Sequence, residues 1–524
     1  MTQATQPPAA TGELAPITVR ERIQALDVIR GFALIGIFLM NVEWFTRPIS
    51  ELGTGVDVSQ TGINYVASWM IYTFVQGKFW TMFSLLFGMG FAVMLGRAQS
   101  ADRGFVTPYI RRIIGLFLFG SAHYVMVWTG DILHNYAVTA IFLLLITTNS
   151  WRTTLALLLS FIATGVAVYF SVGKDSVGPF GMHSMLLTVV LVATYFLNRG
   201  SVARYWKWGV TLYSLPFAIM LAVTAVSALK PKDAVKEPVR QEQVASKPAA
   251  DAAPKPGNAK SNLATTKAKA MAKDEKKEEA TKRAENKAKR EKKRLEEIAL
   301  YTKGSYYDSL VFRTKEYMED LPFAAGLSFL ALPMFLIGFW FVRSGVIGSI
   351  EQHLTLFRRL AITALPIGLV MTLVSVGLHS NFLNADWEDP SNRVAQTLFQ
   401  WGMMPQSIGY VALLVCCLYT PLGKKLLSPL RFAGQMALTN YISANAIGMF
   451  FFSGYGLGYW GQVPRAGQVV FVFTVFALQL LFSWLWLSRF RYGPAEWVWR
   501  AITYWQWPPM RREPAIASPA MASA

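Results

Sequence analysis

The chain has 524 residues, of which 53% are hydrophobic, 14% aromatic and only 15% charged. A soluble protein of this length carries more charge. Apolar runs of roughly 20 residues recur along the chain, and each is long enough to cross a bilayer as a helix. The net charge of +19 lies in loops between these runs and fits membrane topology better than nucleic-acid binding. The sequence therefore predicts an all-α, polytopic membrane protein with no nucleic-acid partner.

The first apolar run, residues 22–45, follows a polar N-terminal tail over residues 1–19 that we expect to be disordered. This run contains Asp27, Arg30 and Asn41, which fall in one sector of a helix about 60° wide. A charge in the centre of a bilayer costs at least ~2.5 kcal/mol, so these residues are expected to face protein. Either Asp27 and Arg30 pair at the headgroup level, or the three line a polar interior with a function.

Twelve membrane spans are predicted. Their centres lie near residues 36, 87, 120, 141, 162, 190, 218, 332, 369, 406, 444 and 477. They divide into an N-terminal half over residues 20–229 and a C-terminal half over residues 301–508, followed by a disordered tail over 509–524. Lys and Arg gather in every second short loop, which predicts two cytoplasmic termini.

A charged, low-complexity insert separates the two halves, over residues 230–300. It is rich in Lys, Glu, Ala and Pro and has no apolar stripe that could pack against the rest of the protein. We therefore expect it to be largely disordered. The topology places it outside the cytoplasm despite its positive charge, since long loops cross the membrane regardless of charge.

A second polar group lies in the predicted hairpin over residues 120–137. His123 is near the end of one span, and Asp131 and His134 open the next at i and i+3. A carboxylate that orients an imidazole makes a general base, so His123, Asp131 and His134 are the catalytic candidates. In the alternative, Asp131 caps the helix and the histidines are structural.

A third polar group contains Asn440, which lies with other polar residues on one face of a C-terminal span. Such amides commonly hydrogen-bond a neighbouring helix, and Asn440 is the one we place among the substrate-binding candidates. No Cys/His spacing suits zinc, so no metal site is predicted. Residues 491–500 mix Trp, Tyr and Arg and predict a helix in the membrane interface.

Several motifs in order resemble the YeiB-like family of bacterial membrane proteins, whose C-terminal half is domain of unknown function 418. They are ALDVIRGFALIGIFLMN (25–41), RRIIGLFLFGSAHYVMVWTGDILHNYA (111–137), GSYYDSLVFR (304–313), GQMALTNYISANAI (434–447), GYGLGYWG (454–461) and RYGPAEWVWRAITY (491–504). Together they cover nearly the whole chain except the insert.

The first helix is also similar to membrane acyltransferases of the heparan-glucosaminide N-acetyltransferase type, in its LDxxRGxA pattern and the later Asn41. That resemblance implies acyl-CoA as a cytosolic donor, with Asp27 and Arg30 shaping its entrance and Arg111 and Arg112 near its phosphates. The predicted partners are the lipid bilayer and a small-molecule or glycan acceptor.

The chain departs from that pattern because no histidine occurs between Asn41 and Gly120. His123 or His134 would then supply the base. Two alternatives to an acyltransferase stay open: a transporter or permease, and a non-catalytic membrane scaffold. A tunnel that meets His123 and Asp131 favours catalysis, whereas a closed interior in which those groups pair with the backbone favours a scaffold.

Overall fold

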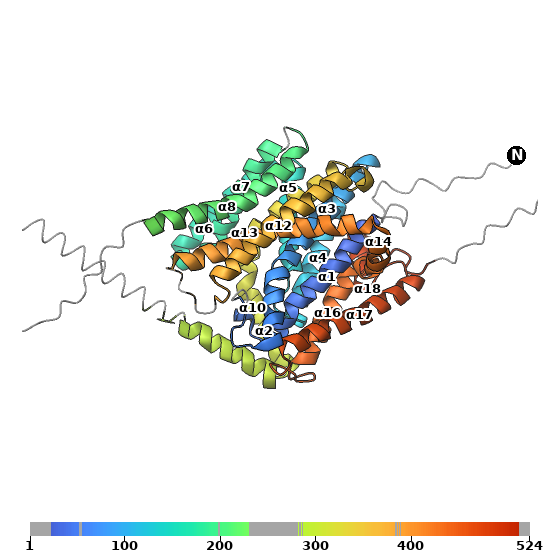
Figure 1. The fold of residues 1–524 in the computed structure, drawn as a ribbon. Helices are drawn as coiled ribbons and strands as arrows, with labels where there is room; N and C mark the ends of the chain where they lie inside the picture. Colours follow the sequence, from blue (N-terminus) through green and yellow to red (C-terminus); the bar gives the residue numbers. More distant parts are fainter. Residues whose placement is uncertain are drawn as a thin grey trace, which may run out of the picture.

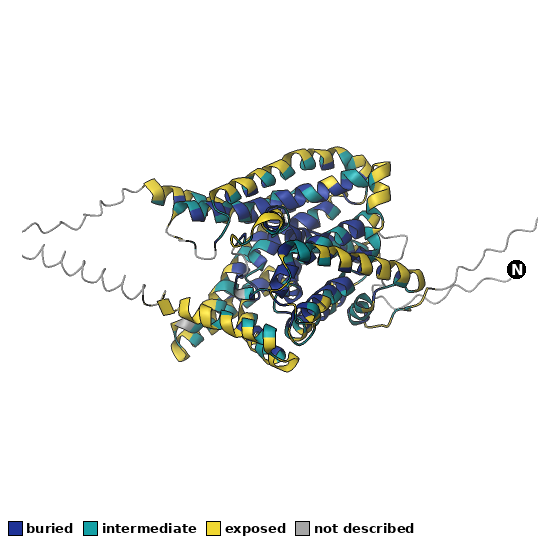
Figure 2. Cartoon of the chain, turned by 60° about the horizontal axis from the view of Figure 1, so that its bottom comes forward, coloured by how far each residue is buried: buried dark blue, intermediate teal, exposed yellow. Residues whose placement is uncertain are grey.

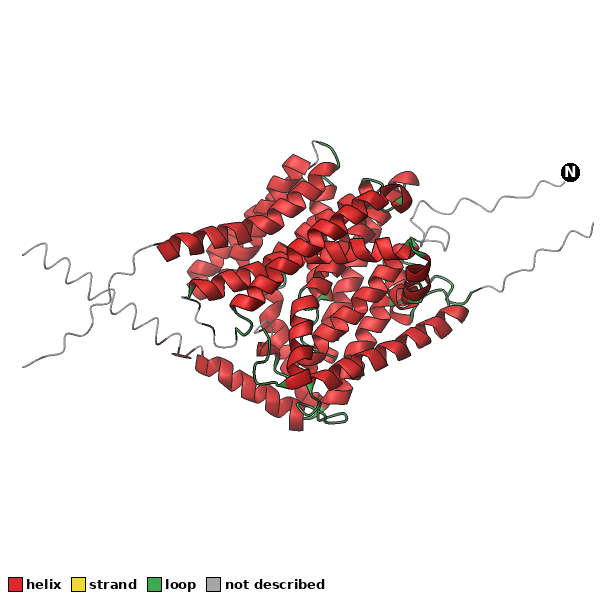
Figure 3. Ribbon diagram, in the orientation of Figure 1, coloured by secondary structure: helices red, strands yellow, loops and turns green. Residues whose placement is uncertain are grey.

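The computed structural model describes residues 23–51, 55–197, 200–229, 281, 284–285, 287–382, 385, 387 and 389–512. The predicted N-terminal tail, nearly all of the C-terminal tail and most of the insert lie outside these residues. Every named element of the described part is helical, which confirms the all-α prediction (Figure 3).

The N-terminal half contains α1 (Gln24–Asn41), α2 (Gly62–Phe74), α3 (Lys78–Ser100), α4 (Val106–Met126), α5 (Leu133–Thr147), α6 (Trp151–Ser171), α7 (Gly178–Leu197) and α8 (Ala203–Leu229). The C-terminal half contains α10 (Tyr306–Asp320), α11 (Ser328–Arg343), α12 (Leu354–Leu378), α13 (Pro390–Leu418), α14 (Pro421–Leu427), α15 (Leu430–Gln435), α16 (Ala437–Phe452), α17 (Arg465–Arg489) and α18 (Pro494–Tyr504). Short 3₁₀ turns join some of them, among them Val42–Phe45 directly after α1.

Among the described residues, eight helical segments are long and apolar enough to cross a membrane, and nine if α10 and α11, which meet at a 67° bend, form one span. A helix covers each of the twelve predicted centres, but several of these helices are short. α5 has 15 residues and so spans about 22 Å, less than the ~30 Å of a hydrocarbon core. The count of twelve therefore stays a prediction.

α1 lies in the interior, surrounded by α3, α15, α16 and α17 (Figure 1). Small residues permit this close packing. Gly31 faces the backbone of Leu430, and Gly434 faces the backbone of Asp27, so neither position has room for a Cβ. Gly88 of α3 likewise touches the backbone of Phe335 in α11, in agreement with the spacing of small residues along α3. α1 therefore presents its polar side chains to protein.

The outer helices show the opposite pattern. In the most apolar part of α6 and of α8, only 11% of the residues are buried, whereas 72% are buried in that part of the segment Gln24–Phe45. The exposed side chains of α6 and α8 include Phe170 and Leu229. Figure 2 shows exposed residues along the outer helices. Apolar surface of this extent matches a lipid environment.

The C-terminal end of the insert differs from the sequence prediction. Residues 287–303 form a helix that docks on the body of the protein. Arg294 pairs with Glu51 at 2.6 Å, Lys293 pairs with Glu316 of α10, and Glu297 accepts a hydrogen bond from the backbone of Ile49 at 2.8 Å. Charged side chains hold this helix, which is why the search for an apolar stripe missed the contact.

Candidate functional site

Asp131 is the centre of a buried set of hydrogen bonds in the hairpin between α4 and α5. Its Oδ1 lies 2.9 Å from His123 Nδ1, and its Oδ2 lies 3.0 Å from His134 Nδ1. The backbone N–H of His134 also donates to Oδ2, at 3.1 Å. All three side chains are buried. The hairpin closes this tightly because Gly120 of α4 faces the backbone of His134, where a Cβ would collide.

Residues from two other helices extend this set. Tyr441 of α16 donates its hydroxyl to Asp131 Oδ1 at 3.4 Å. His123 Nε2 lies 3.0 Å from Asn445 Nδ2, and Asn445 Oδ1 accepts from Asn41 Nδ2 at 3.3 Å. We call these six residues the polar network: Asn41, His123, Asp131, His134, Tyr441 and Asn445.

The hydrogen bonds of the polar network assign the imidazole tautomers. An ionised Asp131 only accepts, so both histidines donate from Nδ1. His123 Nε2 then accepts from the amide of Asn445, which completes a consistent chain of donors from Asn41 onward. Within the part of the chain that the structure describes, His134 Nε2 has no hydrogen-bond partner. His134 is therefore the histidine with an available basic nitrogen.

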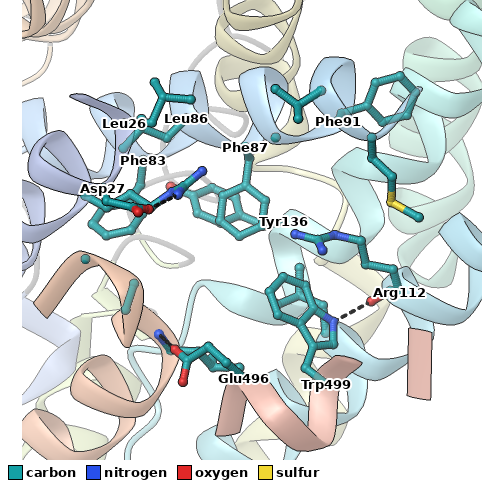
Figure 4. Close-up of a pocket in the computed structure, with 18 of the residues that line it drawn as sticks. Leu26, Asp27, Phe83, Leu86, Phe87, Phe91, Arg112, Tyr136, Glu496 and Trp499 are labelled. Atoms are coloured by element: carbon teal, nitrogen blue, oxygen red, sulfur yellow. Dashed lines mark hydrogen bonds and ion pairs between the residues drawn. The ribbon is translucent and has the colours of Figure 1, made fainter. Parts of the chain in front are cut away.

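A cavity of about 230 Å³ lies beside the network, between α1, α3, α4, α5, α16 and α18 (Figure 4). It follows α3 from Phe83 to Arg97, about 21 Å of helix. Ile132, Leu133 and Tyr441 line it where it meets the network, and Tyr441 belongs to both. We call it the arginine cavity, since four arginines line it: Arg30, Arg97, Arg112 and Arg500.

Positive charge predominates in the arginine cavity. Arg30 and Arg500 lie within electrostatic range of Arg112, whose guanidinium sits 4.0 Å from the ring centre of Trp499. The lining contains two carboxylates. Asp27 pairs with Arg30 at 2.8 Å, and Glu496 accepts hydrogen bonds from the backbone of Leu438 and Thr439.

Glu496 lies on α18, outside the predicted spans, and caps the start of α16. Burial raises the pKa of its carboxyl group above the ordinary value, although the hydrogen bonds from Thr439 and Leu438 act in the opposite direction. Its charge is thus directed at a helix N-terminus, where an anion is favourable. The arginines of the cavity are left with an excess of positive charge.

Most of the predicted site residues lie in one of these two places. Asn41, His123, Asp131 and His134 meet in the polar network. Asp27, Arg30 and Arg112 line the arginine cavity.

The arginine cavity does not take in every polar residue of Asp27, Arg30, Asn41, His123 and Asp131. Of these five residues, only Asp27 and Arg30 are in the lining. Asn41 lies 14 residues after Asp27, which is about 21 Å further along α1. One face of α1 therefore contributes Asp27 and Arg30 to the cavity and, further along the helix, Asn41 to the network.

Two further candidates lie apart from both places. Arg111 stacks over Trp505 and is absent from the cavity lining. Asn440 donates to the carbonyl of Ala433 at 3.1 Å and to Ser483 Oγ at 2.9 Å, so it joins α16 to α15 and α17. This is the helix-joining role that intramembrane amides commonly take.

Sequence reasoning missed Tyr441 and Asn445 as site residues. Both lie on α16, one turn apart. A polar amide in a membrane helix is the same signal that singled out Asn440. Arg97 was missed because it sits in the last turn of α3, and Arg500 because it lies in the predicted interfacial helix; arginine is ordinary at both places in a membrane protein.

Among the described residues, no group of three or more His, Cys, Asp or Glu side chains is arranged to hold a metal ion. The histidine nitrogens closest to Asp131 are engaged with its carboxylate. The arrangement suits proton transfer instead, because a buried carboxylate fixes the ring orientation and stabilises a protonated imidazole.

Comparisons with known proteins place this chain among uncharacterised membrane proteins. The family model described as "Protein of unknown function (DUF418)" matches residues 341–506. The chain is 26% identical to Uncharacterized protein YxaH of Bacillus subtilis, over 96% of this chain and 99% of that protein. It is 25% identical to Uncharacterized protein YeiB of Escherichia coli, over 92% of this chain and 96% of that protein.

No solved structure matches the chain. The two relatives align from end to end, and the family model covers α12 to α18, including Tyr441, Asn445 and Arg500. Residues 341–506 therefore match the DUF418 family, and the chain as a whole is similar to the YeiB-like proteins.

Proposed function

We propose that this protein transfers an acyl group from acyl-CoA, bound in the arginine cavity, to an acceptor that reaches the polar network from the opposite side of the membrane. One observation supports this above the others. A cavity lined by four arginines ends at Tyr441, and Tyr441 donates to the carboxylate that holds two histidines.

The arginines of the cavity suit the phosphates of the donor. Guanidinium groups bind phosphate through paired, charge-assisted hydrogen bonds. Beyond them the wall becomes apolar, with Phe83, Phe87 and Phe91 on α3, and it suits the arm and acyl group of a thioester. Gly90 widens this wall, since a Cβ there would meet no atom within 4 Å.

The chemistry assigned to the network is general base catalysis by His134. Its Nε2 takes the proton from an acceptor hydroxyl or amine, and Asp131 stabilises the resulting imidazolium. The acceptor oxygen or nitrogen then bonds to the thioester carbon, the carbon–sulfur bond breaks, and the thiolate of CoA leaves and takes up a proton. Tyr441 lies between the donor and the carboxylate and is positioned to meet the reacting carbonyl.

This function sets an orientation. The donor is cytosolic, so the open side of the arginine cavity and both termini face the cytoplasm of a bacterial inner membrane, with the α4–α5 hairpin toward the outside. Reporter fusions at the N-terminus, at Arg103 and at Lys273 test it. A cytoplasmic signal from Lys273 would contradict the orientation.

The decisive experiment is an acyl-transfer assay on purified full-length protein in lipid nanodiscs. Labelled acyl-CoA is supplied with a pool of bacterial metabolites, and the acylated product is identified by mass spectrometry. The wild type should release CoA and form product, and Asp131→Asn should do neither. Acyl-CoA that is neither bound nor consumed by the wild type would refute the proposal and favour a transporter or scaffold.

A further inference from the structure

A second group of buried polar side chains, which includes one arginine, lies near the end of α4, where the docked helix 287–303 meets α10. It consists of Tyr301, Ser309 and Arg313, which we call the Arg313 site. All three are buried, with exposed fractions of 2%, 0% and 0%. Three polar atoms in it have no hydrogen-bond partner among the described residues: Tyr301 Oη, Ser309 Oγ and Arg313 Nη1.

Arg313 carries an uncompensated charge. Its Nε and Nη2 donate to the carbonyls of Val125 and Met126 at the end of α4, at 2.8 and 3.3 Å, and no carboxylate of the described residues pairs with it. Carbonyls at a helix C-terminus offset part of a positive charge. The remaining nitrogen, Nη1, is left as a buried donor, which is costly.

The neighbours of that nitrogen are hydroxyl groups. Ser309 lies one turn before Arg313 on the same face of α10, and Tyr301 lies within electrostatic and hydrogen-bonding range of the guanidinium. Glu297 also lies within electrostatic range of Tyr301, and its Oε1 accepts from the backbone of Ile49. Two buried hydroxyls near a guanidinium suit a ligand with several acceptor oxygens and a negative charge.

The Arg313 site lies next to the polar network. One turn after Arg313, Tyr317 places its ring 5.8 Å from His134 and its hydroxyl 2.6 Å from Ser121. The ring of His134 therefore lies against α10. A ligand anchored at Arg313 would be held one helical turn away from the base.

We propose that the Arg313 site binds the anionic group, phosphate or carboxylate, of the acceptor. That the anion belongs to an acceptor rests on the proposed function, whereas the binding of an anion at this site does not. The ligand reaches the site when α10 moves away from α4. Gly304 connects α10 to the docked helix before it, and the turn after Leu321–Phe323 connects it to α11. Polar contacts such as that between Tyr317 and Ser121 hold α10 against α4. Its outer face carries the exposed Tyr307, Val311 and Met318.

The test measures thermal stability of the full-length protein in nanodiscs with millimolar glycerol 3-phosphate, glycerate or glycerol. The wild type should gain stability from a charged probe and none from glycerol. Nanodiscs with and without phosphatidic acid form a further arm, and a gain there assigns the anion to a lipid headgroup. Equal responses to charged and neutral probes, or no response to any anion, would overturn the proposal.

Two variants separate binding from structure. Tyr301→Phe with Ser309→Ala removes hydroxyls that have no partner, so the unliganded protein should keep or gain stability. The affinity for the anion should nevertheless fall about tenfold or more. Tyr72→Phe is the matched control, since it also removes a buried hydroxyl without a partner, in another part of the molecule. An unchanged affinity in the double variant would refute the site.

The two proposals fail differently. Anion binding that depends on Tyr301 and Ser309, without consumption of acyl-CoA, would support the Arg313 site and refute the acyltransferase proposal. Consumption of acyl-CoA with an anion response that ignores these hydroxyls would do the reverse. With both activities present, Arg313→Lys should lower transfer to the charged acceptor.

Discussion

The polar network and the arginine cavity compensate their charges in opposite ways. In the network, one carboxylate receives two imidazoles and a phenol, and two amides complete the chain. In the cavity, four arginines face two carboxylates, of which Asp27 pairs with Arg30 and Glu496 caps α16. The network therefore balances its donors and acceptors, whereas the lining of the cavity contains more cations than carboxylates. A preorganised base beside a cationic pocket is what the proposed two-substrate transfer requires.

The largest effect is expected from Asp131→Asn. The amide keeps the shape of the side chain but removes the charge that orients both histidines, so transfer should fall by roughly 10²–10⁴-fold. The free energy of unfolding should fall by about 1–3 kcal/mol, because two donors lose a charged acceptor. Transfer rate and denaturant unfolding measure the two effects.

Asp57→Asn is the control for Asp131→Asn. Asp57 lies in the loop before α2, outside the network, so its substitution should leave the transfer rate unchanged. Equal transfer by Asp131→Asn and the wild type would show that the network is only structural.

A smaller effect is expected from Arg112→Gln. It removes one cation from the cavity and its contact with Trp499, so the Kd for acyl-CoA should rise about tenfold or more. Arg111→Gln is the matched control, because the neighbouring arginine stacks on Trp505 outside the cavity. Calorimetric titration with acyl-CoA compares the two. Equal losses would show that general surface charge, and not the cavity, attracts the donor.

Gly90→Leu tests the cavity by filling it. Open space at Gly90 lets the new side chain enter without moving the backbone, so the free energy of unfolding should hold or rise by about 0.5–1 kcal/mol. Binding of acyl-CoA should weaken by several-fold, whereas the rate of acyl transfer from the bound complex should change little.

Gly377→Leu serves as the control for the filled cavity. Gly377 of α12 also has open space around it but lies outside the lining. Tight binding of acyl-CoA to Gly90→Leu would place the donor elsewhere.

Patterns along single helices predicted much of this site. Asp27 and Arg30 stand out because charges are rare in apolar segments, and the i, i+3 spacing of Asp131 and His134 predicts their contact at 3.0 Å. The pairing of His123 with Asp131 follows from a tight hairpin, which the sequence places between two spans.

Contacts between distant segments could not be predicted in the same way. Asn41 and Asn445 meet at 3.3 Å although 404 residues separate them, and no spacing rule connects them. The cavity depends on how α18 returns to α4, where Trp499 donates to the carbonyl of Arg112 at 2.9 Å. A single sequence carries the polarity of each helix but not the identity of its neighbour.

The smallest effects are expected in the insert. Deleting residues 231–280, which the composition predicts to have no docking face, should leave membrane insertion and thermal stability nearly unchanged. Arg294→Ala breaks the half-exposed pair with Glu51 and should lower the free energy of unfolding by less than about 1 kcal/mol.

Deleting residues 235–295 should cost more than either change, because it removes both Lys293 and Arg294 and part of the helix that contains Tyr301. The three proteins can be compared by thermal unfolding in nanodiscs. If the shorter deletion destabilises the protein as much as the longer one, the composition argument is wrong. If neither does, the deleted part of the helix over 287–303 contributes nothing to stability. Should the longer deletion also change the anion response at Arg313, the insert would help to close the acceptor side.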